Sequence, residues 1–233
     1  IAGGISIVER SVEDIANALD SETTAALILE PVQGEGGVRV LDPEFVQQLR
    51  ELTRARNVAL IFDEVQCGLG RTGTLFAYEQ LGVTPDLVTL AKPIAAGLPM
   101  GAVLMSEAIA SAVKPGDHGT TFGGGPFVAR VAEYVFDRLR DPALLAAVQA
   151  NGAWFGAELR EIARRTGRIR GVRGVGYMWG IDVTGTAAHV VSEAQSARLL
   201  VCSAGEYTVR LLPPLIATKD ELAQGLAILE QVL

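Results

Sequence analysis

The chain has 233 residues, of which 49% are hydrophobic and 20% charged, a balance typical of a globular protein and not of a disordered one. The formal net charge of −7 and the scattered arginines argue against a nucleic-acid partner. The longest apolar region, residues 87–105, is interrupted by Lys92 and two prolines, so we expect neither a membrane span nor a membrane partner. Two cysteines cannot form a disulfide framework, which favours a cytoplasmic location.

The first part of the chain alternates between strand-like and helix-like segments. Short apolar runs predict strands at residues 25–29, 58–62, 87–90 and 101–105. Capping residues predict helices that begin near Ser11, Asp42 and Ser106. This order predicts an α/β fold with a mainly parallel sheet.

The pattern changes after Pro126. Long amphipathic helices are predicted at residues 127–139 and 142–165, and a capping box at Thr218 and Glu221 opens a last helix that runs to residue 233. Strands are predicted near residues 172–174, 176–183, 199–202 and 208–212. We therefore expect a large domain over residues 1–126 and a smaller α+β domain over residues 127–233.

Lys92 is the residue most informative about function. It is one of three lysines and lies in an apolar stretch without an acidic neighbour, where a charged amine is costly unless its nitrogen is used covalently. A predicted strand upstream ends in Asp63. A desolvated lysine and a strand-end carboxylate are what a pyridoxal phosphate enzyme needs, because the lysine holds the aldehyde as a Schiff base and the carboxylate keeps the pyridine nitrogen protonated. The alternative, a lysine whose amine simply reaches water, suits Lys114 and Lys219 better.

The segment from Asp63 to Gln66 falls where ligands collect in open α/β sheets, at the carboxyl end of a strand. Asp63 would pair with the pyridinium nitrogen, Val65 would pack on the ring, and Gln66 would donate an amide hydrogen to the phenolic oxygen. Taken alone, Asp63 fits a plain turn residue equally well. The glycine-rich segment that follows, and Lys92 beyond it, favour the functional interpretation.

Three further segments carry candidate residues. The Gly-rich turn of residues 30–37 holds two acids, Glu30 and Glu35, which either face a shared pocket or are solvated. The Gly-rich segment 118–126 has hydroxyls suited to a phosphate. Arg210, inside an apolar strand pattern, either reaches water or clamps a carboxylate. His118 and His189 are too isolated to indicate a metal site.

Together these segments resemble the class III (ω-amino acid) aminotransferases of pyridoxal phosphate fold type I, and within that class the acetylornithine aminotransferases and their relatives. The resemblance covers the whole chain in order. It implies that Asp63, Gln66 and Lys92 hold the cofactor. It also implies that Thr121 reaches the phosphate of a neighbouring subunit in a homodimer. Arg210 matches the substrate carboxylate clamp, and Glu35 matches the acid that pairs with that arginine when an ω-amine is presented. Cys67, Pro93 and Gly125 depart from the usual pattern without removing a reacting group.

The expected activity is transfer of the terminal amino group of N-acetylornithine, or a similar blocked diamino acid, to 2-oxoglutarate in arginine or lysine biosynthesis. The alternatives are another class III enzyme, such as a 4-aminobutyrate-type transaminase or an aminomutase, and a non-catalytic truncated homologue. The family's N-terminal segment, with its phosphate cradle, has no counterpart in these residues. We therefore expect an incomplete large domain with an apolar sheet face left uncovered.

Overall fold

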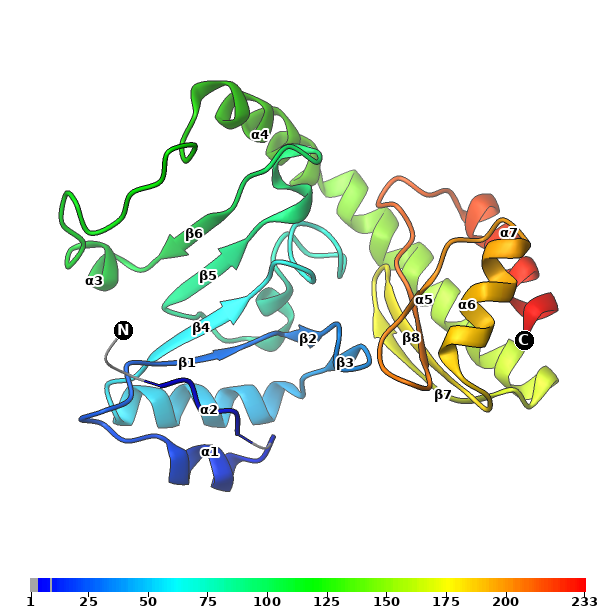
Figure 1. The fold of residues 1–233 in the computed structure, drawn as a ribbon, viewed down its shortest axis with the longest axis horizontal. Coiled ribbons are helices and arrows are strands. Elements are labelled where there is room, and N and C mark those ends of the chain that lie inside the picture. Colours follow the sequence, from blue (N-terminus) through cyan, green and yellow to red (C-terminus); the bar gives the residue numbers. More distant parts are fainter. Residues whose placement is uncertain (1–3, 9) are drawn as a thin grey trace.

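A four-stranded mixed sheet forms the centre of the first part of the chain (Figure 1). The protein is described by a computed structural model over residues 4–8 and 10–233. Strands β1 (Ala26–Leu29), β4 (Ala59–Asp63) and β5 (Leu87–Leu90) are parallel, and β6 (Ala102–Met105) pairs antiparallel with β5. The order β1-β4-β5-β6 confirms the predicted α/β architecture and the four predicted strands.

Helices cover one face of this sheet. The buried side chains of β4 pack with those of helix α2 (Pro43–Ala55) and the 3₁₀ helix η1 (Ala77–Leu81), while α1 (Val12–Ala18) packs on α2. Asp42 caps α2 by accepting the backbone N–H groups of Glu44 and Phe45, as predicted. Arg50 of α2 pairs with Asp86, whose carboxylate also accepts the N–H of Leu60 at 2.8 Å. This ion pair fixes the helix to the sheet.

The opposite face of the same sheet is open. Strand register places one row of apolar side chains across all four strands, consisting of Ile28, Ile61, Leu87 and Met105. Ile28 is 57% exposed, and Val103 on the same face is 50% exposed. Parallel strands are normally buried on both faces. The uncovered apolar face expected from the sequence is therefore present.

A second, antiparallel sheet forms the later part of the chain, in the order β7-β8-β10-β9. Its strands are β7 (Ile169–Val175), β8 (Met178–Val183), β10 (Thr208–Leu211) and the short β9 (Cys202–Ser203). Helices α5 (Pro142–Thr166), α6 (Ala187–Ser196) and α7 (Lys219–Val232) share its hydrophobic core. Tyr177 and Ile181 lie fully buried there. These elements give the α+β composition expected for this part.

Helices α4 (Pro126–Leu139) and α5 connect the first sheet to the second. Ala132 and Leu139 of α4 share a cluster with Val88 and Leu90 of β5, so α4 packs on the first sheet. Asp141 caps α5, which runs from there into the second part (Figure 1). A boundary near Pro126 would assign α4 to the smaller domain, but α4 lies against the first sheet. The boundary therefore stays a proposal.

Local differences from the sequence prediction have physical reasons. Helix α6 was not predicted, since its central valines are poor helix formers, but Thr186 caps it and Ala187, Val190 and Ala194 bury one face. The predicted strand 199–202 is wrong for all but its last residue, because 199–201 form no ladder and only Cys202 pairs with β10.

The turn of residues 30–37 lies in a hairpin of β2 (Val32–Gln33) and β3 (Arg39–Val40). The helix predicted near Ser106 is the single turn α3 (Glu107–Ala110). No helix in the described part of the chain is long and apolar enough to cross a membrane.

Candidate active site

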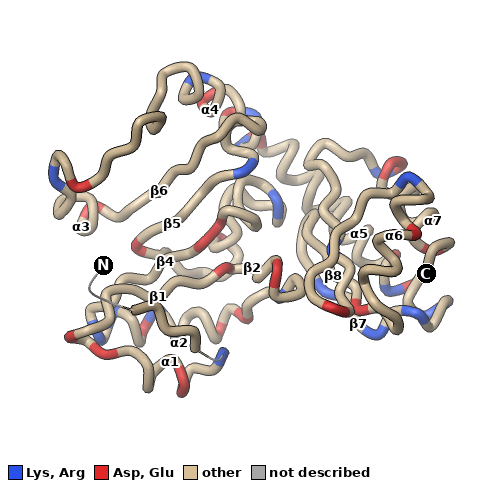
Figure 2. The backbone as a smooth tube through the Cα atoms, viewed as in Figure 1, with Lys and Arg blue, Asp and Glu red and all other residues tan. Residues whose placement is uncertain are grey.

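Asp63 lies at the carboxyl end of β4, next to the end of β5. Thr89 of β5 donates its hydroxyl to Asp63 Oδ1 at 2.9 Å, and the Val65 N–H donates to the same oxygen at 3.0 Å. Among the described residues, no hydrogen bond reaches Oδ2. The carboxylate is thus held in one orientation with one oxygen still able to accept a proton donor. Figure 2 shows acidic residues at the end of β4 near a basic segment that follows β5.

Lys92 opens the 3₁₀ helix η2 (Lys92–Ala95) directly after β5. Its backbone φ of 48° is left-handed, a conformation that non-glycine residues adopt at a cost and that concentrates at functional sites. The expectation that the lysine is desolvated is wrong for these residues, because its side chain is exposed. The sequence identified an apolar neighbourhood, but it could not show which of these residues are covered: Ile94 and Ala95 of η2 are buried, whereas Lys92 is exposed.

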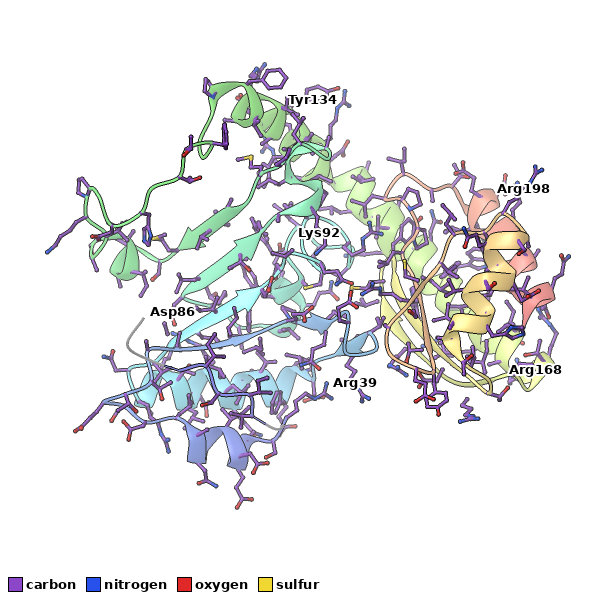
Figure 3. All side chains as sticks on the ribbon, viewed as in Figure 1. Arg39, Asp86, Lys92, Tyr134, Arg168 and Arg198 are labelled. Atoms are coloured by element: carbon purple, nitrogen blue, oxygen red, sulfur yellow. The ribbon has the colours of Figure 1, made fainter. Side chains whose placement is uncertain are left out.

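A cavity of about 350 Å³ brings four of the predicted site residues together. They come from the hairpin turn, the segment after β4, η2 and β10, and they are Glu35, Gln66, Lys92 and Arg210. Figure 3 shows Lys92 between the end of β5 and the second part of the chain. Asp63 and Val65 precede Gln66 and do not line the cavity. Thr121 lies elsewhere, exposed in the segment that connects α3 and α4.

Arg210 forms the polar centre of this cavity. Its Nη1 donates to Glu35 Oε1 at 2.6 Å and to Gln66 Oε1 at 2.9 Å. Its Nε is buried and has no hydrogen-bond partner among the described residues. A buried guanidinium donor without an acceptor is costly, and a bidentate carboxylate would satisfy it. The Arg210 side chain is 10% exposed whereas the Glu35 side chain is 75% exposed, so of the two it is the glutamate that can move.

Gln66 is oriented by its neighbours. Because Oε1 accepts from Arg210, the amide nitrogen is left to donate. Gly34 packs on this amide so closely that a Cβ there would lie 2.2 Å from Oε1. Glu30 accepts the Gly34 N–H at 3.1 Å, which shapes the turn. A glycine is therefore required at position 34 to leave room for the Gln66 side chain.

Two charged residues of the site received no role from the sequence. Arg71 lines the cavity and donates to the backbone oxygens of Tyr177 and Pro213 in the second part of the chain. Burial lowers the pKa of Arg71 to about 10, which leaves it charged at neutral pH. Glu64 is buried and accepts the N–H groups of Ala77 and Tyr78, both at 2.8 Å. For both residues, the only signal in the sequence was a charged side chain within or beside a glycine-rich segment.

Solved structures of aminotransferases share this fold. The structure of Plasmodium falciparum ornithine delta-aminotransferase has a TM-score of 0.91 and 31% identity, and the match covers 98% of this chain and 59% of that one. N-acetylornithine aminotransferase from Stenotrophomonas maltophilia has a TM-score of 0.87 and 34% identity over 96% of this chain and 60% of its own. The fold is that of the fold type I pyridoxal phosphate aminotransferases.

Sequence comparison defines the family. The model of aminotransferase class III matches residues 3–233. A probable mitochondrial acetylornithine aminotransferase of Dictyostelium discoideum is 43% identical, covering 99% of this chain and 52% of that protein. Acetylornithine aminotransferase of Methanothermobacter thermautotrophicus is 42% identical over 94% of this chain and 56% of its own length. The chain belongs to the class III aminotransferases, a family of pyridoxal phosphate enzymes. It spans about half the length of the curated relatives it matches.

Proposed function

We propose that this chain carries the lysine, ring-nitrogen partner and carboxylate clamp of a transaminase. The enzyme would move the terminal amino group of N-acetylornithine, or a similar blocked diamino acid, to 2-oxoglutarate, in arginine or lysine biosynthesis in the cytoplasm. The observation that carries the proposal is the cavity that unites Lys92, Gln66, Glu35 and Arg210. Relatives named acetylornithine aminotransferase, at 42–44% identity, support the choice of amino donor.

The residues present fit pyridoxal phosphate. Asp63 offers Oδ2 as an acceptor for a protonated ring nitrogen, Gln66 offers amide hydrogens for the phenolic oxygen, and Lys92 offers a primary amine. When bound, the cofactor supplies an electron sink for the bond that breaks at the substrate carbon. The part of Asp63 is to keep the ring nitrogen protonated, and Val65 would pack against the ring.

Lys92 Nζ would act twice. It would hold the cofactor aldehyde covalently and, once free, its amine would take the proton from the substrate carbon and donate a proton back. Its position on η2, directly after β5, places it at the same sheet edge as Asp63. This role requires a group that covers Lys92, since the described residues leave it exposed.

Glu35 and Arg210 would separate the two half-reactions. With Glu35 paired to Arg210, the clamp is neutralised and the cavity accepts an ω-amine. When Glu35 leaves, the guanidinium of Arg210, whose Nε has no partner among the described residues, can bind the α-carboxylate of 2-oxoglutarate. The large difference in exposure between the two side chains supports a moving glutamate and a fixed arginine.

A homodimer forms part of the proposal. Thr121 is exposed and far in the chain from the cavity residues, which suits a hydroxyl that donates to the phosphate bound by a neighbouring copy. The test is the Thr121→Val variant. We expect it to weaken cofactor binding without changing the subunit's fold, measured by cofactor titration and circular dichroism. Unchanged cofactor affinity would remove Thr121 from the site.

Amino transfer to 2-oxoglutarate, measured with N-acetylornithine and with 4-aminobutyrate in parallel, tests the proposed activity. We expect N-acetylornithine to be the better donor. Lys92→Ala should reduce turnover by several orders of magnitude, because it removes both the anchor and the proton-transfer group. Lys114→Ala, a matched change at another exposed lysine, should leave turnover as it is. Preference for 4-aminobutyrate would favour the other class III enzymes, and no turnover with either donor would favour a non-catalytic homologue.

A further inference from the structure

Glu35 lines two cavities. One is the active-site cavity that also holds Arg210. The other, of about 510 Å³, lies between the hairpin of β2 and β3 and the second sheet. Its charged residues besides Glu35 are Arg39, Arg170, Arg173, Asp182 and Glu206. Because the Glu35 side chain is 75% exposed, packing does not confine its carboxylate to the first cavity.

The arginines of the second cavity differ in how far they are already engaged. Arg173 is used fully: it pairs with Asp182 through both Nη atoms, and its Nε donates to Gly37 O at 2.6 Å. Arg170 donates Nη2 to the backbone oxygen of Thr184. Arg39 donates only Nε, to Gly36 O at 2.9 Å, and it forms no ion pair within residues 4–8 and 10–233.

Arg39 is also the arginine that the hairpin places with Glu35. Glu35 lies in the turn between β2 and β3, Arg39 is the first residue after that turn, and the bond from Arg39 Nε to Gly36 O holds the guanidinium beside it. Figure 3 shows Arg39 at the end of the hairpin, next to the second sheet. Asp182 and Glu206 share the cavity, but Asp182 is occupied by Arg173 and Thr208.

We propose that Arg39 holds the Glu35 carboxylate whenever Glu35 leaves Arg210, so that the second cavity stores the displaced glutamate while a substrate carboxylate occupies the clamp. This inference rests on the proposed function, and it makes Arg39 a positioning residue for the half-reaction that uses 2-oxoglutarate. Without Arg39, the displaced carboxylate would lose the guanidinium that lies beside the turn, and water would replace much of the interaction it had with Arg210. An exposed ion pair shifts such an equilibrium by about three-fold, which biases the movement without locking it.

A double-mutant cycle tests this coupling, with glutarate as a dicarboxylate probe that has no reactive keto group. Affinity is measured by calorimetric titration of the protein. Arg39→Met should weaken glutarate binding about three-fold when Glu35 is present. In the Glu35→Gln background the same change should have no effect, because an uncharged side chain gains nothing from Arg39. Arg168→Met removes an exposed arginine that lines neither cavity, and it serves as the matched control for the lost charge.

The possible outcomes separate this inference from the function on which it rests. Equal weakening by Arg39→Met in both backgrounds, or none in either, would overturn the inference. Thermal unfolding of each variant identifies any loss of affinity that comes from misfolding. If Arg210→Ala leaves glutarate binding unchanged, the clamp itself is wrong and both proposals fail. If binding depends on Arg210 but shows no coupling between Glu35 and Arg39, only the inference fails.

Discussion

In the proposed mechanism, one buried guanidinium, that of Arg210, binds the substrate carboxylate. Arg210→Ala removes a charge-assisted contact of roughly 2–3 kcal/mol. We therefore expect kcat/KM to fall at least ~30-fold for the substrate whose α-carboxylate is clamped. Steady-state kinetics with 2-oxoglutarate measure this effect. A fall of less than about three-fold would mean that substrate carboxylates bind elsewhere.

Glu35→Gln should act in a different way from Arg210→Ala. The amide cannot neutralise Arg210, so the clamp stays charged in both half-reactions. We expect faster reaction with 2-oxoglutarate relative to the ω-amine donor, and single-turnover measurements of each half-reaction report the ratio. An equal effect on both would return Glu35 to the role of a solvated turn residue.

At the residue scale, the sequence could indicate chemical types but not their partners. Lys92 and Asp63 stand out because a charge follows an apolar strand in each case. The contact between Glu35 and Arg210 joins residues 175 positions apart, which no local pattern reveals. The exposure of Lys92 was missed for a similar reason. Whether a side chain is covered depends on groups packed over the sheet edge, not on its neighbours in sequence.

Glu64 links the segment after β4 to the start of η1. Burial raises the pKa of this carboxyl to about 7 from an ordinary value of 4.5. Between these two pH values the folded protein binds more protons than the unfolded chain, so the free energy of unfolding decreases as pH rises from about 4.5 to about 7. The total change is at most about 3 kcal/mol. Denaturant unfolding across this range checks it, with Glu64→Gln expected to flatten the profile. A profile that rises with pH and is removed by this substitution would contradict the assignment.

The turn between β7 and β8 fixes the two parts of the chain to each other. Gly176 has φ 54°, and a Cβ there would lie 2.6 Å from Arg71 O. Tyr177, the next residue, donates its N–H to the same oxygen at 2.9 Å. Gly176→Ala should therefore lower the free energy of unfolding by about 3 kcal/mol, because it adds overpacking to a left-handed conformation.

Gly167 provides the matched control for that change. It ends α5 with φ 63°, but nothing lies within 4 Å of a Cβ built there. Gly167→Ala should cost only about 1 kcal/mol, the cost of the left-handed backbone alone. Chemical denaturation of the two variants gives the comparison. Equal losses would show that the contact between Gly176 and Arg71 contributes nothing to stability.

At the element scale, prediction succeeded where signals were local and strong. Asp42 with Pro43, Asp141 with Pro142, and Thr218 with Glu221 each began a helix where expected. Helix α6 and the hairpin of β2 and β3 depend on burial against other elements, and the sequence gives weak local evidence for either. Glu35 and Arg39 of the hairpin nevertheless line the cavities, which is why the geometry around Glu35 required the structure.

The open sheet face determines how the whole molecule should behave. We expect a protein made of these residues alone to self-associate through the row that contains Ile28 and Met105. Adding Ile28→Lys and Met105→Lys should reduce association in sedimentation experiments. Ile216→Lys, a change at another exposed apolar residue outside the sheet, should not. A single species that does not associate further, formed by these residues alone, would contradict this expectation.

Covalent labelling tests the central claim, that Lys92 anchors the cofactor aldehyde. The protein is incubated with pyridoxal phosphate, reduced with borohydride and mapped by peptide mass spectrometry. All three lysines of the chain are exposed, so Lys114 and Lys219 act as internal controls for simple accessibility. Selective pyridoxyl labelling of Lys92 is the predicted result. Label distributed evenly over the three lysines, or absent from Lys92, would contradict the account.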